Sequence, residues 1–547
     1  MPVALPKRSR INQIVLATLE AVFKSSGYNL TLWGRPPKAL TYAPEPIWKG
    51  EPRIGNNIIL GKFHLSDGSI LTSVDPWSND LDDRNARAEL HTFTWLRDLA
   101  EVEDMTTARE RLQTLVRDWI TQNDTWSPLA WRSDILAERV SLWLEYYDRL
   151  FAASGKSFRI LVVRHLKKQL KHLHRVTEFE ADSVGRFTAL KGLICGAMCL
   201  PTGSKRRSFL IKKLEREIDR QILEDGGHKS RCPSTHHFVL RRLIEIRSIL
   251  VGCSYPVPKK LENAIGSMAP ALRFFRHQDG GLSLFNGSQS ETAEVVDRTL
   301  IKADSRGQPS ASLPIAGFER FLSGRMLALM DTGGPPPADF DDPAHAGTLS
   351  LEISIGRERL VTNCGAVSDG AGEWRNVQRT TAAHSTLSLE NRNSVELLSA
   401  GGIGKRRPDV SISRDDNEEC FVCTATHNGY TGVLGTTHSR IIKLSKNREQ
   451  LDGIDQLLGG AGLRFDIRFH LHPAVSVSIM QNGNSAILKL PKGGGWQFDS
   501  VGAALSLEDS IFLDGGTSRR SKQLVVSGET TATATEVSWS IHALGER

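Results

Sequence analysis

Residues suited to chemistry gather at predicted strand ends between His345 and Glu390. Alternating apolar and polar residues predict strands at 348–353 and 359–363, and a third strand is expected after His384. One histidine precedes the first strand, another precedes the third, and the second strand ends at an amide and a thiol. Strand ends of one sheet can bring imidazole, amide and thiol groups together. The pattern therefore predicts a metal site or a polar catalytic wall on a rigid scaffold.

The metal hypothesis rests on His345 and His384, with Asn363 or Cys364 as the third ligand. Zinc takes imidazole and thiolate donors and needs a satisfied second shell. Asn is a poor zinc ligand, so Cys364 is the better third donor, although it is expected on the opposite face of the strand from Asn363. Taken singly, each histidine also fits a strand-end residue that bonds a backbone carbonyl. Zinc is thus one of two interpretations, and the sequence requires no cofactor.

Residues 224–238 form a second polar cluster with the sequence EDGGHKSRCPSTHHF. Its glycine pair and proline predict a loop between two helices, and Ser234 or Thr235 is expected to cap the second helix. Because helix N-termini favour negative charge, the loop's basic residues could bind a carboxylated or sulfated ligand. A capping loop with surface histidines is the alternative, since turn chemistry explains the glycines and proline. The candidate residues for such a ligand are His228, Arg231 and His236, and His237 also stands in the first turn of the second helix.

Arg186 is a third candidate, and it follows the acidic residues Glu178, Glu180 and Asp182. A cation in the first turn of the apolar helix expected at 187–200 opposes the helix dipole, so a specific partner is expected. A solvated ion pair with Glu180 or Asp182 is the alternative. A hydrolase that uses these carboxylates is a weaker hypothesis, because no acid pair of known separation can be identified.

The overall composition fits a protein of two or more domains with full hydrophobic cores, since the chain has 547 residues. Its net charge of +7 favours acidic partners. No zinc-finger spacing, RNP-like aromatics or long Lys/Arg tract indicates nucleic acid. Seven cysteines, an odd number, argue against a disulfide framework. Cys420 and Cys423 are interpreted as strand packing rather than as a metal or redox pair.

Residues 1–23 combine basic residues with an interrupted apolar period, without a clean apolar core or a signal cleavage site. We expect an amphipathic first helix there. No stretch approaches the roughly 20 apolar residues that span a bilayer. The sequence therefore predicts no integral membrane segment.

The apolar period divides the chain into two halves. From about residue 86 to 275 it is helical, with short connections, which predicts a bundle, solenoid or toroid. From about residue 318 it becomes two, with Gly, Asn and Asp punctuation, as in antiparallel sheets. The expected domains are an N-terminal arm with the first helix (1–84), a helical domain (85–314) and a sheet domain (315–547).

Individual helices are expected at similar lengths along the first half, and short strands are expected in the arm. The expected helices cover 90–99, 108–119, 134–150, 158–174, 186–200, 209–223, 237–251 and 261–275, and the arm strands cover 53–54 and 57–60.

The motifs together resemble those of the heparinase II/III family of polysaccharide lyases, and the resemblance covers most of the chain. The family implies an N-terminal α/α toroid followed by a C-terminal antiparallel β-sandwich. The resemblance is carried by Asp225-Gly-Gly-His, Cys232-Pro-Ser-Thr-His236, His345-Ala-Gly-Thr-Leu-Ser-Leu-Glu-Ile, Leu360-Val-Thr-Asn-Cys-Gly365, Ala383-His-Ser-Thr, Asn428-Gly-Tyr430, His438-Ser-Arg440 and Arg468-Phe-His-Leu-His-Pro473.

What the resemblance implies is β-elimination at a uronic acid. One group neutralises the carboxylate, a base removes the C5 proton, and an acid protonates the leaving oxygen. The family's neutralising Asn-His pair falls where this chain reads Val-Gly-Arg186, so Arg186 is the substitute cation. The family's tyrosine acid and base corresponds to Thr235, which cannot replace a phenol near neutral pH. His236 keeps its place, and His228 lies nearby in the sequence.

In the sandwich, the family's histidine corresponds to His345 and its next histidine to His384. A strand-end Asp that ligates zinc in some members corresponds to Asn363, so the anionic ligand is lost here.

The leading hypothesis is a carbon–oxygen lyase that acts on an acidic, uronate-containing polysaccharide such as a glycosaminoglycan. Its expected catalytic residues are His236, His228, His345 and Arg186, and Arg231 and His237 are expected to bind substrate. The alternative is a glycan-binding or exopolysaccharide-assembly protein that kept the fold and lost elimination. The family suggests the cell envelope or periplasm, whereas the lack of an evident secretory signal suggests the cytoplasm.

Overall fold

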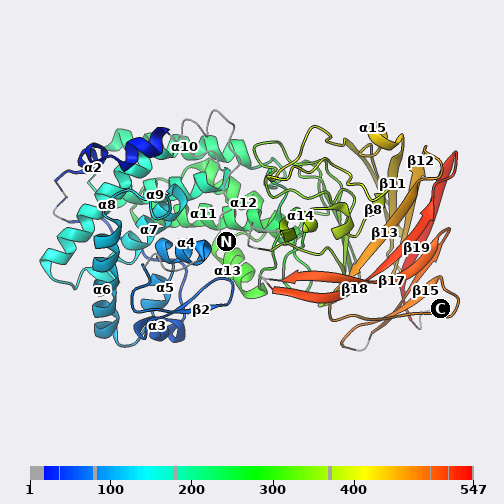
Figure 1. Ribbon diagram of the computed structural model, residues 1–547, viewed down its shortest axis with the longest axis horizontal. Helices are drawn as coiled ribbons and strands as arrows, with labels where there is room; N and C mark the ends of the chain where they lie inside the picture. The colour runs from blue at the N-terminus through cyan, green and yellow to red at the C-terminus, as the bar shows by residue number, and fades with distance from the viewer. Residues whose placement is uncertain are drawn as a thin grey trace. The chain divides into compact units, whose positions relative to one another are not determined.

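The structure, a computed structural model, describes residues 18–35, 37, 39–77, 83–177, 183–201, 203–367, 373–492, 494–514 and 517–544 (Figure 1). The chain packs into two compact units. The N-terminal unit comprises the chain up to Gln221 together with Arg241–Ala264, and the C-terminal unit comprises Ile222–Leu240 and Ile265 onward. The domain limits expected from the sequence stay a prediction. Most of the segment expected as the first helix lies outside the described residues.

Helices dominate the N-terminal unit, and most begin and end near the places that the apolar period predicts. Their apolar faces pack on one another, as where α7 contacts α9. The elements are α2 (Ser26–Leu32), α3 (Pro52–Ile59), β1 (Lys62–His64), β2 (Ile70–Thr72), α4 (Arg84–Thr92), α5 (Leu96–Leu99), α6 (Met105–Asn123), α7 (Ser133–Glu145), the π-helix Tyr147–Phe151, α8 (Lys156–Val176), α9 (Ser183–Cys199) and α10 (Ser204–Gln221), while α11 (Pro233–Gly252) and α12 (Lys259–Phe274) contribute residues to both units.

Two local predictions are wrong. The helix expected over 90–99 is two helices, because Phe93 adopts a left-handed conformation (φ 63°) that ends α4. The strands expected at 53–54 and 57–60 are helix α3, which has Pro52 in its first turn. Gly55 lets α3 approach the backbone of Asp98 closely, because a Cβ at position 55 would lie 2.3 Å from the Asp98 carbonyl oxygen. Such short apolar runs do not distinguish a strand from a helix by period.

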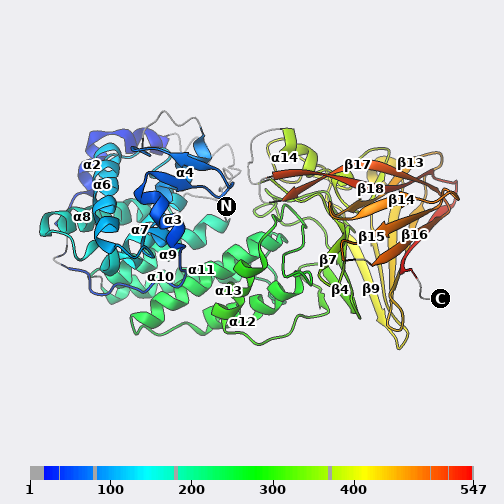
Figure 2. The same cartoon turned by 90° about the horizontal axis from the view of Figure 1, so that it is seen from below.

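Two antiparallel sheets form most of the C-terminal unit (Figure 2). One has the strand order β14-β15-β16-β19-β12-β11-β10-β9, and the other has β17-β18-β13-β7-β6-β5-β4-β3, with β8 beside β13. The elements are α13 (Ala293–Ala303), β3 (Ser312–Leu313), β4 (Phe318–Ser323), β5 (Met326–Asp331), β6 (Leu351–Ile355), β7 (Glu358–Thr362), α14 (Glu373–Gln378), the 3-10 helix Thr381–Ala383, β8 (Leu387–Leu389), β9 (Val410–Asp416), β10 (Cys420–His427), α15 (Thr431–Leu434), β11 (Thr437–Ser445), β12 (Gln450–Leu458), β13 (Arg464–Leu471), β14 (Ser476–Ile479), β15 (Ser485–Lys489), β16 (Gly495–Val501), β17 (Ala504–Asp514), β18 (Thr517–Glu529) and β19 (Ala534–Ala543).

Aromatic side chains from both sheets meet in the core. The ring of Phe469 on β13 lies 5.0 Å from the ring of Phe498 and 4.8 Å from that of Trp539, which belong to the other sheet. All three side chains are buried. Burial of such rings contributes to the stability of the sandwich.

The sandwich core also holds one satisfied charge network around Asp455. His438 donates to one carboxylate oxygen at 2.7 Å, Trp539 donates to the other at 2.9 Å, and Arg440 donates to both. Arg440 and these hydrogen bonds hold the pKa of the Asp455 carboxyl well below its usual range, although burial acts in the opposite direction. The His-Ser-Arg motif is therefore a structural part of the fold.

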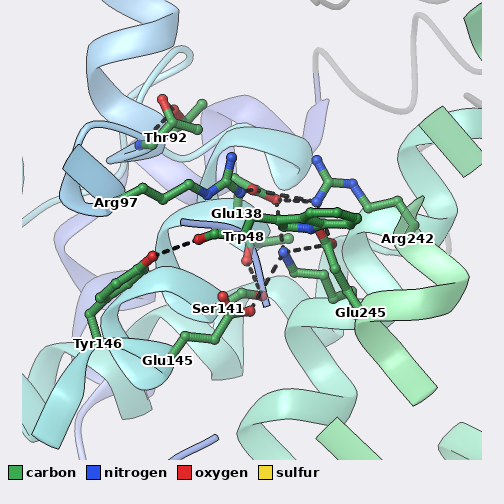
Figure 3. A network of polar contacts seen from close by, with 12 residues as sticks. Trp48, Thr92, Arg97, Glu138, Ser141, Glu145, Tyr146, Arg242 and Glu245 are labelled. Atoms are coloured by element: carbon green, nitrogen blue, oxygen red, sulfur yellow. Dashed lines mark hydrogen bonds and ion pairs between the residues drawn. The ribbon is translucent and has the colours of Figure 1, made fainter. Parts of the chain in front are cut away.

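A buried cluster of charges links the helices of the N-terminal unit (Figure 3). The ammonium group of Lys191, which is fully buried, lies 3.2 Å from Glu138, 3.0 Å from Glu245 and 3.7 Å from Glu145. Arg242 contacts Glu245 at 2.5 Å and Glu138 at 3.1 Å. Helices α7, α9 and α11 are thereby joined by ion pairs in their interior.

The arm is fastened to this cluster through Trp48 (Figure 3). Its indole donates to Glu245 at 2.5 Å, and its carbonyl accepts from Tyr146 at 3.1 Å. Arg97 of α5 adds a third cation, 2.9 Å from Glu138. Three carboxylates thus face three cations inside one unit.

Two Asp-Gly-Gly corners of the C-terminal unit have the same internal bonding. In the first, Asp225 accepts from Gly227 N–H at 3.0 Å, and in the second, Asp279 accepts from Gly281 N–H at 2.8 Å. The middle glycines have φ of 82° and 91°, the left-handed region that glycine adopts without strain. The other aspartate oxygen receives the backbone N–H of Ala316 at 2.8 Å in the first corner and the side chain of Arg359 at 2.7 Å in the second.

Candidate active site

His345 and His384 contact each other as the sequence predicts. Nδ1 of His345 lies 3.1 Å from Nε2 of His384, and Nδ1 of His384 lies 2.7 Å from the carbonyl oxygen of Thr380. Because a carbonyl only accepts, His384 carries its proton on Nδ1 and accepts on Nε2. His345 must then donate from Nδ1, which leaves the Nε2 lone pair of His345 unprotonated.

Both imidazoles are held neutral. Burial lowers the pKa of His384 to about 4 and lowers the pKa of His345 well below its usual value, and neighbouring His384, Arg379 and Arg375 add to the second shift. His345 is 6% exposed, and a Cβ at Gly287 would lie 3.4 Å from its Nε2. The arrangement holds a neutral imidazole in one orientation.

Glycine in the His-Ala-Gly motif makes room for this pair. A Cβ at position 347 would lie 2.7 Å from Cδ2 and 3.1 Å from Cγ of His384. No real Cβ tolerates such a contact with a buried ring, so Gly347 is required for the position of His384.

Asn363 and Cys364 do not complete a metal site with these histidines. The Asn363 amide donates to Glu352 at 3.2 Å and accepts from the backbone N–H of Ser385 at 3.0 Å. The Cys364 thiol lies 3.5 Å from His470 instead, and burial raises its pKa to about 12. In the part of the chain that the structure describes, no three His, Cys, Asp or Glu side chains form a group that could hold a metal ion. The residues present therefore do not fit zinc.

The histidines of the 224–238 loop are buried, so the interpretation of surface histidines is wrong. His228, His236 and His237 are each 1–2% exposed. His236 donates from Nε2 to the carbonyl of Met268 at 2.8 Å, and burial lowers its pKa to about 4. His237 lies 2.8 Å from the Thr299 hydroxyl. Sequence patterns missed this burial because helix α11 and the loop are covered by residues distant in sequence.

The contacts of His228 define its neutral tautomer. Its Nδ1 accepts from the backbone N–H of Ser230 at 3.1 Å and also lies 2.8 Å from the Ser230 hydroxyl. A neutral His228 therefore carries its proton on Nε2. The tautomer of His228 differs from that of His345, whose Nε2 carries no proton.

Arg231 has a structural role, although the sequence suggested substrate binding. Its guanidinium donates to the carbonyls of Ala316, Gly334 and Gly317 at 2.7, 2.6 and 3.0 Å and forms a buried ion pair with Asp331. Arg231 itself adopts a left-handed conformation (φ 56°). The loop is thus anchored through this residue.

Arg186 of the N-terminal unit lies 3.6 Å from Glu217, and its side chain is 32% exposed. Glu178, Glu180 and Asp182 lie outside the described residues. The role of Arg186 in neutralising a uronate stays a prediction.

No tyrosine of the C-terminal unit is available as an acid or base. Thr235 stands at the expected position and is buried. Of the six tyrosines in the chain, only Tyr430 belongs to this unit, and its hydroxyl is buried and donates to the carbonyl of Leu387 at 3.0 Å. Burial raises its pKa further.

Arg375 is a candidate that the sequence did not reveal. It lies on α14, is close enough to lower the pKa of His345, and pairs with Asp342 at 3.1 Å. Its side chain is 21% exposed, and the neighbouring Trp374 is 51% exposed. No motif marks α14, because proximity to His345 arises only from the fold.

Comparison with known proteins defines the class of this chain. The family profile "Heparinase II/III N-terminus" matches residues 56–306, and "Heparinase II/III-like, C-terminal" matches residues 305–540. The chain belongs to the heparinase II/III-like family.

Solved structures agree with this fold. The chain matches the structure of heparinase III with a TM-score of 0.76 at 13% identity, covering 100% of this chain and 93% of that one. It matches heparan sulfate lyase HepC from Pedobacter heparinus with a TM-score of 0.62 at 17% identity, covering 98% and 90%. The predicted α/α toroid followed by a β-sandwich is therefore confirmed.

A further relative is FtsZ-localized protein C of Caulobacter vibrioides, which is 27% identical over 93% of this chain and 90% of that protein.

Across the described helices, none combines the length and apolar character that crossing a bilayer requires.

Proposed function

We propose that the protein cleaves an acidic, uronate-containing glycan by β-elimination, with His345 as the base. The observation that carries this proposal is the Thr380–His384–His345 hydrogen-bond chain, which fixes an unprotonated Nε2 on His345. The fixed tautomer leaves the Nε2 lone pair of a neutral His345 available to accept the C5 proton near neutral pH.

The remaining steps are assigned within the same unit. Arg375 supplies positive charge for the uronate carboxylate and stabilises the anion that forms when the C5 proton leaves. In its imidazolium form, with Nδ1 facing the Ser230 hydroxyl, His228 donates the Nε2 proton to the leaving glycosidic oxygen and returns to the neutral tautomer. The glycosidic C4–O bond breaks, a C4–C5 double bond forms, and His345 keeps the C5 proton. Zinc has no place in this scheme.

The test measures the ultraviolet absorbance of the unsaturated uronate product on heparan sulfate, alginate and bacterial exopolysaccharides. We expect turnover of at least one of them and its loss in His345→Ala. The control is His542→Gln, a partly exposed histidine of β19, which should keep parent activity. Folded protein with no turnover on any of these glycans would contradict the proposal.

A second candidate is a glycan-binding or assembly protein without turnover. It is favoured by the replacement of the family's tyrosine by Thr235 and of its Asn-His pair by Arg186. The relative named for localisation with FtsZ points in the same direction, because that name describes a position in the cell rather than an activity. Glycan binding that survives His345→Ala, in a protein without turnover, would support this candidate.

The cellular compartment is a separate proposal. We propose the cell envelope, where acidic polysaccharides are exposed, with the cytoplasm as the alternative. Fractionation of cells that express the tagged full-length chain distinguishes the two.

A further inference from the structure

A pocket of about 190 Å³ lies on the N-terminal unit, far along the chain from His345. It is lined by Trp33 after α2, by Asp124 after α6, and by Arg164, Lys167 and Lys168 of α8. No residue of the proposed active site contributes to it. The pocket is therefore a feature that the proposed chemistry does not use.

The pocket carries more positive charge than its own carboxylate balances. Asp124 is engaged by Lys168 at 2.8 Å and by His165 at 3.5 Å. In the described residues, Arg164, Lys167 and Lys171 form no ion pair with a carboxylate. Burial, Lys167 and Arg175 lower the pKa of Lys171, as expected where cations crowd without an anion between them.

Backbone carbonyls of the segment after α2 hold the cations in place. Lys167 donates to the carbonyl of Arg35 at 2.7 Å, and Lys171 donates to that of Trp33 at 2.6 Å. Each ammonium group keeps two further donors. Arg164 lies 6.0 Å from the centre of the Trp33 ring, and Trp33 is 55% exposed. An aromatic face and several oriented cations thus border one hollow.

We infer that this pocket is a second, non-catalytic binding site for an acidic saccharide, whose ring stacks on Trp33 and whose carboxylate or sulfate binds Arg164 and Lys167. The choice of a saccharide rests on the proposed function, since the chemistry of the pocket requires an oxyanion next to a flat apolar face. The concave shape suits a single ring, whereas a membrane would need a broader apolar face than α2 offers. The site would hold the polymer while the C-terminal unit acts on it.

The test is calorimetric titration of the full-length chain carrying His345→Ala, which prevents turnover, with a heparan sulfate oligosaccharide. Trp33→Ala and the pair Arg164→Gln with Lys167→Gln should each weaken one class of binding by about tenfold or more, the range for lost charge-assisted hydrogen bonds. Arg159→Gln, an exposed cation of α8 outside the pocket, is the matched control and should bind like the parent.

Three outcomes are informative. Unchanged binding in the pocket variants would overturn the inference. Pocket variants that keep oligosaccharide binding but lose binding to phosphatidylglycerol vesicles would also overturn the inference, in favour of a membrane. Leu30→Ser, at an exposed apolar residue of α2, is the comparison variant and should weaken only vesicle binding. Pocket-dependent binding in a protein without turnover would keep this inference while the proposed function fails.

Discussion

At the scale of single residues, the protonation of His345 follows from the atoms beside it. The Thr380 carbonyl fixes the tautomer of His384, and His384 fixes that of His345. His384 is therefore a positioning residue, comparable to the partners that orient histidines in metal sites. Nothing in a sequence reveals a tautomer, although the two histidines themselves were predictable from the strand pattern.

Replacing His384 by Phe keeps a buried ring and removes the acceptor for His345. We expect kcat/KM to fall by about 10- to 100-fold, the usual effect of removing an orienting partner. The acid limb of the pH profile should also move to higher pH, because His384 helps to lower the pKa of His345. Measurement of kcat/KM from pH 4 to 9 checks both. An unchanged acid limb would show that His384 only fills space.

His236 gives a pH prediction for stability. Its pKa in the folded protein is about 4, below the ordinary value of 6.5, because burial disfavours the cation. The folded state therefore binds fewer protons than the unfolded state between these values, and stability is lost as the pH falls from about 6.5 towards 4. We expect this loss to be on the order of 2–3 kcal/mol for His236.

Urea unfolding at pH 7 and pH 5 measures this loss. His236→Gln keeps a donor for the Met268 carbonyl and cannot become charged, so its midpoint should depend less on pH than that of the parent. An equal pH dependence in both proteins would assign the acid sensitivity to other buried histidines.

At the scale of elements, most helices and strands follow from periodicity, and the exceptions have local causes. Phe93 ends α4 in a left-handed conformation that no short-range pattern marks. Some strands of the sandwich bury alternate residues, as β12 does from Gln450 to Leu458, which makes them recognisable from the sequence, whereas β5 and β6 are buried at every position. Arg375 could not be predicted in this way, because its proximity to His345 depends on where the fold places α14.

Gly347 and Gly266 form a matched pair for testing the packing at His384. Gly347→Ala should reduce activity strongly, since its Cβ would lie 2.7 Å from the His384 ring. Gly266 lies inside α12 with no atom within 4 Å of a Cβ. Gly266→Ala should keep activity and stabilise the protein by up to about 1 kcal/mol, because alanine favours helix.

Product absorbance and thermal unfolding of both variants provide the measurements. Full activity in a folded Gly347→Ala protein would mean that the ring of His384 can move without consequence for His345.

At the scale of the whole molecule, the buried charge cluster joins α5, α7, α9, α11 and the arm in the N-terminal unit. Its members are not equivalent. Arg242 and Lys191 lower the pKa of Glu138 to about 2 against its burial. Burial raises the pKa of Glu145 to about 7, with repulsion from Glu245 and Glu138 adding to the shift. Glu145 therefore costs stability as the pH rises from about 4.5 to 7.

Two substitutions in the cluster should have opposite effects. Lys191→Met leaves the carboxylates short of a cation and should destabilise the protein by about 3–5 kcal/mol. Glu145→Gln should be tolerated, and its stability relative to the parent should increase from pH 5 to pH 8. Hydrogen exchange in α9 and thermal unfolding measure both. Similar losses for the two variants would contradict the assigned charge states.

The two Asp-Gly-Gly corners have a consequence for how such a fold can change. In each corner, one aspartate oxygen accepts the N–H of the second glycine, and the other oxygen is left to bind a different segment. This second oxygen accepts from a backbone N–H in one corner and from an arginine side chain in the other. The turn and its attachment are therefore structurally independent. The segment that bonds to the second aspartate oxygen can be replaced by another without a change in the turn itself.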